Sequence, residues 1–243
     1  KKLVEYLRDP QVGCVTGELT YTSPSANDNN SSGESFYWKL EKRIKSLEGK
    51  LGAVLGANGA IYALPVKLYE ELGEKMISDF VEPLEILLKG YKLLYAPDAI
   101  ATEEVPSEGG GFQRRERIVV RTVQSFLNNK KLFKLLDPIT FPIPSLQLFF
   151  HKVLRWLTGV LLIGIFFINI FLYQKPPYNY LLWLQVIFYS LGIWGWLSQK
   201  IFLLPKTKIT FILWYFFGSV YAMMKGLYRG LRGDYIVTWG TNK

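Results

Sequence analysis

The chain has 243 residues, 49% of them hydrophobic and 16% aromatic, and its formal net charge is +9. A basic chain can bind nucleic acid, but no Asp or Glu lies between Asp137 and Asp234, and the nine Lys and Arg residues of that apolar stretch account for the whole excess. We therefore expect no nucleic-acid partner, and the single cysteine, Cys14, excludes an intrachain disulfide and a cysteine-based metal site.

The distribution of charge divides the chain near residue 138. Outside the stretch between Asp137 and Asp234, basic and acidic residues balance. Basic residues that flank apolar segments set membrane topology and contact anionic lipid headgroups. The sequence therefore predicts a soluble domain over residues 1–137, an interfacial amphipathic helix over 138–155 and a membrane region over 156–243.

The soluble part alternates predicted strands and helices. Residues 12–22 are rich in β-branched side chains and lie between two X-Pro pairs, which predicts a strand. Residues 35–51 place apolar side chains at three- and four-residue spacing, which predicts an amphipathic helix. A glycine- and alanine-rich turn at 56–59, a short apolar run at 60–64 and a helix near 66–72 follow.

Three further elements complete the soluble part. Asp79 begins a helix that Gly90 closes, and residues 91–99 return as a strand. Residues 114–129 form a helix with a strongly basic first turn, where cations are unfavourable because the positive end of the helix dipole lies there; we expect this cluster to serve an anion. The alternation predicts an α/β layered sheet.

The C-terminal part is apolar. Residues 141–156 combine aromatic and aliphatic side chains with His151, Lys152 and Arg155, which is typical of a helix lying along a bilayer, with His151 near the headgroups. Three uncharged segments follow, at about 156–173, 180–198 and 209–224. At about 1.5 Å per residue the first two are long enough to span a bilayer. If the third crossed as well, the basic residues after it would violate the positive-inside rule, so either the rule is broken or this segment does not cross.

A resemblance to a known family rests on five stretches in the correct order. They are VGCVTGELTY from residue 12, SFYWKLEKRIKSLEGKLGAVLGANGAIYALP from residue 35, SDFVEPLEILLKGYKLLYAPDAIATEEV from residue 78, FQRRERI from residue 112, and HKVLR from residue 151 with the apolar segments and Trp239 after it. Together they resemble the acceptor-side half of membrane-associated family 2 glycosyltransferases, which include cellulose and hyaluronan synthases. The resemblance covers nearly the whole chain. It implies an α/β partial GT-A domain, then an interfacial helix and an all-α membrane region.

Transfer of a sugar with inversion requires a carboxylate that takes the proton from the attacking hydroxyl. Asp79 matches the family's catalytic acidic position, the last residue of its ED or DD motif, and Ser78 replaces the residue before it. A structural interpretation stays open, in which Asp79 caps the following helix and Glu82 completes a capping box.

The departing diphosphate requires cationic groups. The basic stretch that matches the family's Q-x-x-R-W region consists of Gln113, Arg114, Arg115 and Arg117. Arginine forms bidentate contacts with phosphate, although a solvated basic helix start would have a similar composition. Ile118 replaces the tryptophan that often accompanies processive synthesis, so the motif does not favour a processive enzyme.

Acceptor contacts are implied at two places. Gly56, Asn58 and Gly59 match a small-residue loop beside the acceptor, where glycine lets the backbone approach a sugar closely; a plain turn would use the same residues. Trp38, in the stretch that matches the family's Y-W-x-x-E helix, either stacks on a sugar ring or belongs to the core.

The resemblance also implies Mg²⁺ or Mn²⁺, held by a D-x-D motif in a nucleotide-binding half that precedes these residues. No D-x-D occurs in the chain. We therefore expect the metal site upstream, no metal site among these residues, and no activity from them alone.

The expected function is that of an inverting hexosyltransferase. It would transfer a sugar from a nucleotide-sugar donor to a polysaccharide or glycolipid acceptor, as an integral membrane protein of a bacterial-type plasma membrane with its catalytic domain in the cytosol. Two other classes stay open: a transporter or channel subunit with a cytosolic domain, and a non-catalytic membrane scaffold. The apolar segments contain no ionisable residue, which disfavours a transport pathway.

Overall fold

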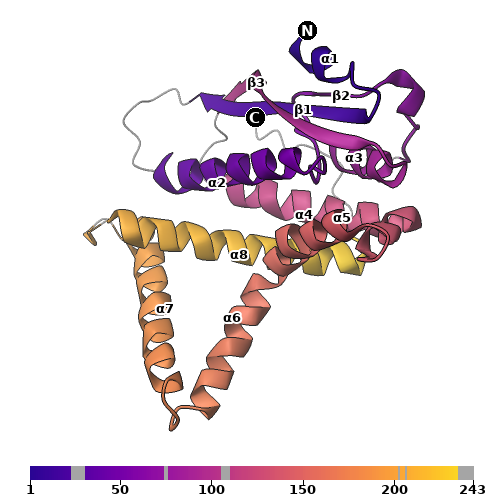
Figure 1. The fold of residues 1–243 in the computed structure, drawn as a ribbon. Helices are drawn as coiled ribbons and strands as arrows, with labels where there is room; N and C mark the ends of the chain where they lie inside the picture. The colour runs from indigo at the N-terminus through magenta and orange to yellow at the C-terminus, as the bar shows by residue number, and fades with distance from the viewer. Residues whose placement is uncertain (23–30, 74–75, 105–109, 202, 206, 235–243) are drawn as a thin grey trace.

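The computed structural model describes residues 1–22, 31–73, 76–104, 110–201, 203–205 and 207–234, and their side chains except at 21–22, 31–38, 104 and 110. A three-stranded sheet lies at one end of the molecule (Figure 1), with its strands in the order β2-β1-β3. The central strand β1 (Val12–Thr22) pairs in parallel with β3 (Lys92–Glu104) and antiparallel with β2 (Tyr62–Ala63). The predicted strand 12–22 is thus confirmed. The strand predicted at 91–99 is confirmed as β3, which continues to residue 104.

Helices cover both faces of this sheet. The short α1 (Lys2–Tyr6) lies on one face, and α2 (Ser31–Lys50) and α3 (Ser78–Leu88) lie on the other (Figure 1). The larger core is on the side of α2 and α3, where Cys14, Val54, Leu84 and Leu93 are almost fully buried. Burial of such side chains supplies most of the stabilisation of the α/β part. The predicted α/β layering is therefore present, with a small sheet and predominantly helical surroundings.

The prediction of a helix near residues 66–72 is wrong. Only a single 3-10 turn forms there, η1 (Val66–Leu68), and Tyr69 already has extended dihedral angles. Val66 is 89% exposed and Tyr69 is 56% exposed. Leu68 and Leu72 pack against the core from this segment without a helix, and so short a helix is marginal on its own.

The chain is helical from the end of the sheet onward. The helix α4 (Gly110–Asn128) begins four residues earlier than expected, so the arginines that follow Gln113 lie in its second turn rather than its first. After the 3-10 segment η2 (Lys130–Leu136), three helical segments follow without a break: α5 (Pro142–Gln147), the π-helical η3 (Leu148–Val153) and α6 (Leu154–Phe171). The helix predicted at 141–156 therefore continues directly into the first long apolar segment.

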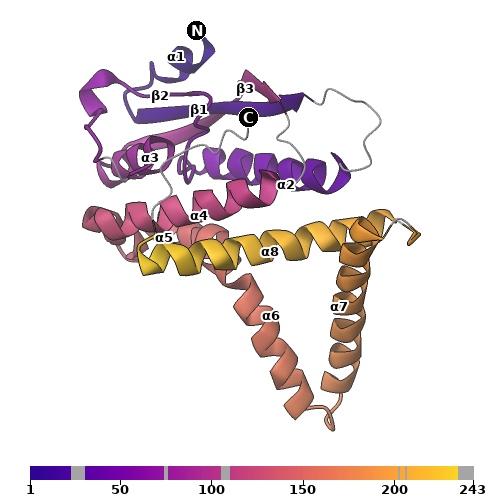
Figure 2. The ribbon, with the colours of Figure 1, turned by 180° about the vertical axis from the view of Figure 1, so that it is seen from behind.

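The helices α6 and α7 (Tyr178–Lys200) form a hairpin that projects away from the α/β part (Figures 1 and 2). Two helices, Pro142–Phe171 and Tyr178–Lys200, are long and apolar enough to cross a membrane. Only 11% and 17% of their most apolar windows are buried, whereas the core helix of a soluble protein would be mostly buried. Their exposed apolar surface is consistent with membrane association.

The third apolar segment belongs to α8 (Lys208–Arg232), which lies along α4 and across the open end of the hairpin (Figures 1 and 2). It is not among the helices that are apolar enough to cross. Glycines allow the close approach to α4: a Cβ on Gly226 would lie 2.7 Å from the Glu116 carbonyl oxygen, and one on Gly230 would lie 2.8 Å from Val123 Cβ. The Glu116 carboxylate also pairs with Lys225 and Arg229 of α8, at 3.0 and 2.7 Å. Basic residues near the end of α8 thus contact α4.

Candidate active site

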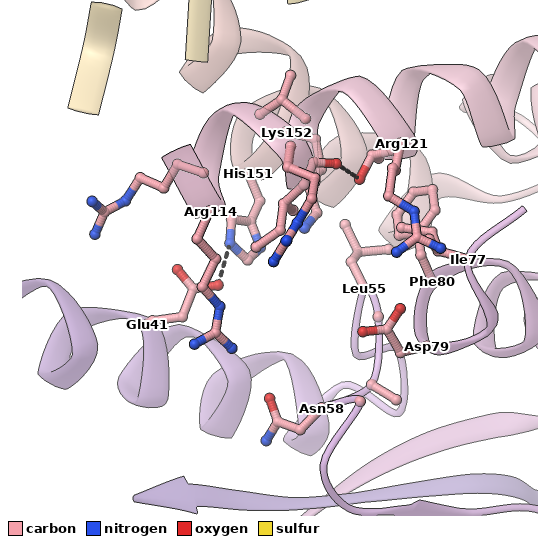
Figure 3. Close-up of a pocket in the computed structure, with 18 of the residues that line it drawn as sticks. Glu41, Leu55, Asn58, Ile77, Asp79, Phe80, Arg114, Arg121, His151 and Lys152 are labelled. Atoms are coloured by element: carbon pink, nitrogen blue, oxygen red, sulfur yellow. Dashed lines mark hydrogen bonds and ion pairs between the residues drawn. The ribbon is translucent and has the colours of Figure 1, made fainter. Parts of the chain in front are cut away.

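A cavity of about 420 Å³ lies between α2, the loop 56–59, the start of α3, α4 and the junction of η3 with α6 (Figure 3). Seven basic side chains and three acidic ones line it. The basic residues are Lys45, Arg114, Arg115, Arg117, Arg121, Lys152 and Arg155, and the acidic ones are Glu41, Asp79 and Glu103. Because cations predominate, the cavity suits an anionic ligand.

Asp79 projects into this cavity from the first turn of α3 (Figure 3). The capping interpretation is wrong, because the N-cap residue is Ile77 and no side chain caps the helix. Glu82 does not form a capping box either; its carboxylate accepts a hydrogen bond of 3.0 Å from the Tyr62 hydroxyl. The Asp79 carboxylate therefore does not cap the N-terminus of α3.

The loop 56–59 packs directly against Asp79. The Ala57 amide donates a hydrogen bond of 2.6 Å to the Asp79 carbonyl. Gly56 has a φ of +105°, and a Cβ on Gly59 would lie 2.9 Å from Asp79 Oδ2. Both glycines are required by this geometry, the first by its backbone and the second by the close approach.

Asn58 connects the same loop to the sheet and to α2 by hydrogen bonds. Its side-chain amide donates to the Gly17 carbonyl and accepts from Lys45 Nζ, and its backbone amide donates to Thr16 Oγ1 at 2.7 Å. Both ends of the Asn58 amide are thus used within the protein, so Asn58 positions the loop and Lys45 rather than presenting its amide to a ligand.

Burial and neighbouring cations have opposite effects on Asp79. Burial, the larger effect, raises the pKa of the carboxyl group above its ordinary value, while Lys45, Arg121 and Lys152 lower it. Burial also lowers the pKa of Lys45, and Glu41 partly compensates. The result is a carboxylate with a raised pKa, surrounded by cations, in a cavity; such groups are frequent at functional sites.

The arginines of α4 separate into two sets. Arg114, Arg117 and Arg121 are three and four residues apart, which places them along one side of the helix that lines the cavity. The pKa of Arg117 is lowered by burial and by the charges of Arg114 and Arg121. Arg115 also lines the cavity but turns toward α8, where its guanidinium donates to the Tyr215 hydroxyl at 2.6 Å and stacks on that ring. Gln113 is exposed and does not line the cavity.

Four functional candidates were missed from the sequence: Arg121, His151, Lys152 and Arg155. The signal for Arg121 was its position four residues after Arg117, on the same side of the helix. The sequence pattern predicts a lipid interface for the other three. For His151 this is wrong, because its side chain is 8% exposed and lies between two glutamates of α2.

The contacts around His151 join α2 to the apolar helix Pro142–Phe171. His151 Nδ1 lies 2.7 Å from Glu48 Oε1, and Nε2 lies 3.4 Å from Glu41 Oε1. Arg155 donates to the other Glu41 oxygen at 3.1 Å. Burial alone would raise the pKa of Glu41, but His151, Arg155 and Lys152 hold it well below its usual range. Glu41 is therefore an ionised member of the cavity wall.

Trp38 lies on α2, but its side chain is outside the described part, so its stacking on a sugar stays a prediction. Within the described residues, no group of three or more His, Cys, Asp or Glu side chains is arranged to hold a metal ion.

No protein-family model matches the chain. The chain is similar to a protein from Rhizobium sp. (strain N33) named N-acetylglucosaminyltransferase, with 29% identity over 128 residues. The similarity covers 48% of this chain and 28% of that protein. The chain thus spans well under half of the relative's length, and membership of family 2 and the GT-A fold stay predictions.

Proposed function

We propose that this chain is part of a glycosyltransferase that moves a sugar from a nucleotide-sugar donor to an acceptor hydroxyl. The observation that carries the proposal is the position of Asp79 in a cavity lined predominantly by cations. The similarity to a protein named as a glycosyltransferase supports it independently. The family resemblance, with its GT-A fold, belongs to the same proposal.

The proposed reaction is a single displacement with inversion. The acceptor oxygen attacks the anomeric carbon, its proton passes to Asp79, and the bond from that carbon to the diphosphate oxygen breaks with both electrons leaving on the oxygen. Asp79 serves as general base. The cations Arg117, Arg121 and Lys152 balance the charge that develops on the departing diphosphate, which is the role of preorganised electrostatic stabilisation.

Mg²⁺ or Mn²⁺ would supply a further positive charge on the diphosphate in the proposed enzyme. The described residues do not fit such an ion, because they contain no suitable ligand cluster. No step of the proposed reaction on these residues depends on it; the expected D-x-D site would lie in the part of the enzyme that precedes them.

The arrangement of helices supports a membrane location for the site. We propose that Pro142–Phe171 and Tyr178–Lys200 cross the bilayer and that α8 lies along its surface without crossing. The basic end of α8 then stays on the same side as α4 and the cavity, in agreement with the positive-inside rule. The cavity faces the cytosol in this orientation.

A panel of nucleotide sugars tests the proposed function. Membrane vesicles that contain the whole enzyme, including the part expected to precede these residues, are incubated with each donor, and release of the nucleoside diphosphate is measured together with transfer of radiolabelled sugar to membrane extracts. We expect one donor class to be consumed above the level of vesicles without the protein. Consumption of none of the donors would argue for the transporter or scaffold interpretation instead.

The pH dependence of that activity should respond to Lys45. Activity falls as the pH drops through the pKa of Asp79, because the base must be ionised. Lys45 lowers this pKa, so Lys45→Met should raise it further and move the acidic limb of the kcat/KM profile to higher pH. Lys39→Met, an exposed lysine on the same helix, should leave the limb in place. An unchanged limb in the Lys45 variant would mean that Asp79 is not the titrating group.

A further inference from the structure

A second cavity, of about 570 Å³, adjoins the candidate active site between α2, the η3–α6 junction and α8. Its walls are mainly apolar and include Ile44, Phe150, Leu154, Ile212, Phe216 and Val220. It shares Glu41, His151, Arg155 and Met223 with the first cavity. The two cavities are therefore neighbours that share these residues; the first is cationic and the second is apolar. We call the second cavity the apolar groove.

The few hydroxyl groups in the walls of the apolar groove already have partners. Thr158 Oγ1 donates to the Leu154 carbonyl at 3.1 Å, and Ser219 Oγ donates to the Tyr215 carbonyl at 2.6 Å. The Tyr215 hydroxyl accepts a hydrogen bond from Arg115. A sugar chain in the groove would lose its hydrogen bonds to water and regain few, which is costly. A hydrocarbon chain has no hydrogen bonds to lose, and burial of its apolar surface is favourable.

The end of the apolar groove that meets the active site is polar. Glu41 and Arg155 form an ion pair there, at 3.1 Å, and His151 lies against the same carboxylate. Such groups donate to and accept from hydroxyls. An amphiphile in the groove would therefore place its hydroxyl-bearing head at Glu41 and Arg155, which also line the cavity that contains Asp79, and its chain along α8.

The position of α6 supplies a source for such a molecule. One wall of the groove is the η3–α6 segment, which belongs to the candidate span Pro142–Phe171. A lipid of the surrounding bilayer would reach the groove along this helix without exposing its chain to water.

We propose that the apolar groove binds the hydrocarbon chain of the acceptor, so that the acceptor is a membrane lipid whose polar head carries the hydroxyl that receives the sugar. This inference rests on the proposed function and selects one acceptor class within it. The head hydroxyl oxygen forms the new bond to the anomeric carbon, its proton passes to Asp79, and the diphosphate leaves.

Photolabelling tests the groove without reference to catalysis. The probe is decyl glucoside with a diazirine in its alkyl chain, added to vesicles that contain the protein; a second probe has the same chain and no sugar head. We expect saturable labelling of peptides from η3 and α8 by the glucoside, and competition by unlabelled decyl glucoside. Unsaturable labelling spread over the exposed sides of α6 and α7, equal for both probes, would overturn the inference, because it would indicate bulk lipid only.

Variants that fill the groove sharpen the test. Ile212→Trp on α8 and Ile44→Trp on α2 each reduce its volume, and each should lower saturable labelling by about tenfold, which corresponds to losing the burial of about two methylene groups. Ile209→Trp, three residues away on α8, is the matched control: Ile209 is 66% exposed and does not line the groove, so its replacement should have no effect. Unchanged labelling in both groove variants, with the proteins folded as judged by near-ultraviolet circular dichroism, would also overturn the inference.

Transfer assays separate this inference from the proposed function. If no donor is consumed but labelling is localised and sensitive to Ile212→Trp, the proposed function fails and the lipid groove stands. If sugar is transferred equally well by Ile212→Trp and by the unmodified protein, and to a water-soluble oligosaccharide rather than to lipid, the function stands and the lipid acceptor is excluded.

Discussion

Asp79→Asn is expected to reduce sugar transfer by about 10²- to 10⁴-fold, the range of a general base. Asparagine has nearly the same shape as aspartate, but it cannot accept the proton of the attacking hydroxyl. The packing of the loop 56–59 against this residue should survive, since the contact at Gly59 is one of shape and the hydrogen bond from Ala57 goes to the backbone. The measurement is kcat for transfer in membrane vesicles, with protein amount determined by immunoblot.

The control for this variant is Asp9→Asn. Asp9 is exposed in the turn before β1 and accepts a hydrogen bond from the Gln11 amide, which an asparagine oxygen can also accept. Its replacement should leave both kcat and expression unchanged. Binding of the nucleoside diphosphate product should be retained in Asp79→Asn, because the cations that would hold it are intact. Turnover near the normal level in this variant would dismiss Asp79 as the base.

Arg121→Met should lower kcat by about 10²- to 10³-fold, the effect of removing one preorganised donor from a developing oxyanion. The buried Arg121 Nε has no hydrogen-bond partner among the described residues, and the side chain lines the cavity above Asp79 (Figure 3). A diphosphate oxygen would satisfy that group. The variant should also weaken inhibition by the nucleoside diphosphate, which can be measured at fixed donor concentration.

Two further variants distinguish this role from a structural one. Arg121→Lys keeps the charge but not the planar fork of donors, so its kcat should be intermediate. Lys130→Met removes an exposed cation just after the same helix and should change neither kcat nor inhibition. If Arg121→Met lowered thermal stability while kcat per folded molecule stayed normal, the residue would be structural only.

The sequence predicts those parts of the fold that depend on neighbouring residues. β1 follows from the β-branched run 12–22, and the end of α3 follows from Gly90, whose φ of +84° is readily adopted only by glycine. Asp79 lies in the first turn of α3, as its position in the sequence predicts. The helix predicted at residues 66–72 does not form: Leu68 and Leu72 reach the core from a 3-10 turn and an extended stretch, which no local pattern distinguishes from a short helix.

The missing part of the site depends on contacts between residues that are far apart in the sequence. His151 and Glu48 are separated by 103 positions and Arg155 and Glu41 by 114, and no local pattern indicates that they meet. A basic helix beside an apolar segment has the same composition whether its cations face lipid headgroups or buried carboxylates. The sequence feature that agrees with these contacts is the spacing of the charged residues. Glu41 and Glu48 lie two turns apart on α2, and His151 and Arg155 lie one turn apart on the facing helix.

If the helix Pro142–Phe171 crosses the bilayer as proposed, its link to α2 couples the cavity energetically to the bilayer. Glu41 and Glu48 are buried against His151 and Arg155, and removal of the partners from buried charges typically costs about 3–5 kcal/mol. A soluble truncation that ends before Pro142 would lose this compensation together with Lys152. By thermodynamic linkage, any lipid or detergent that changes the tilt of this helix should change the affinity of the cavity for its anionic ligand, and binding of that ligand should in turn bias the tilt.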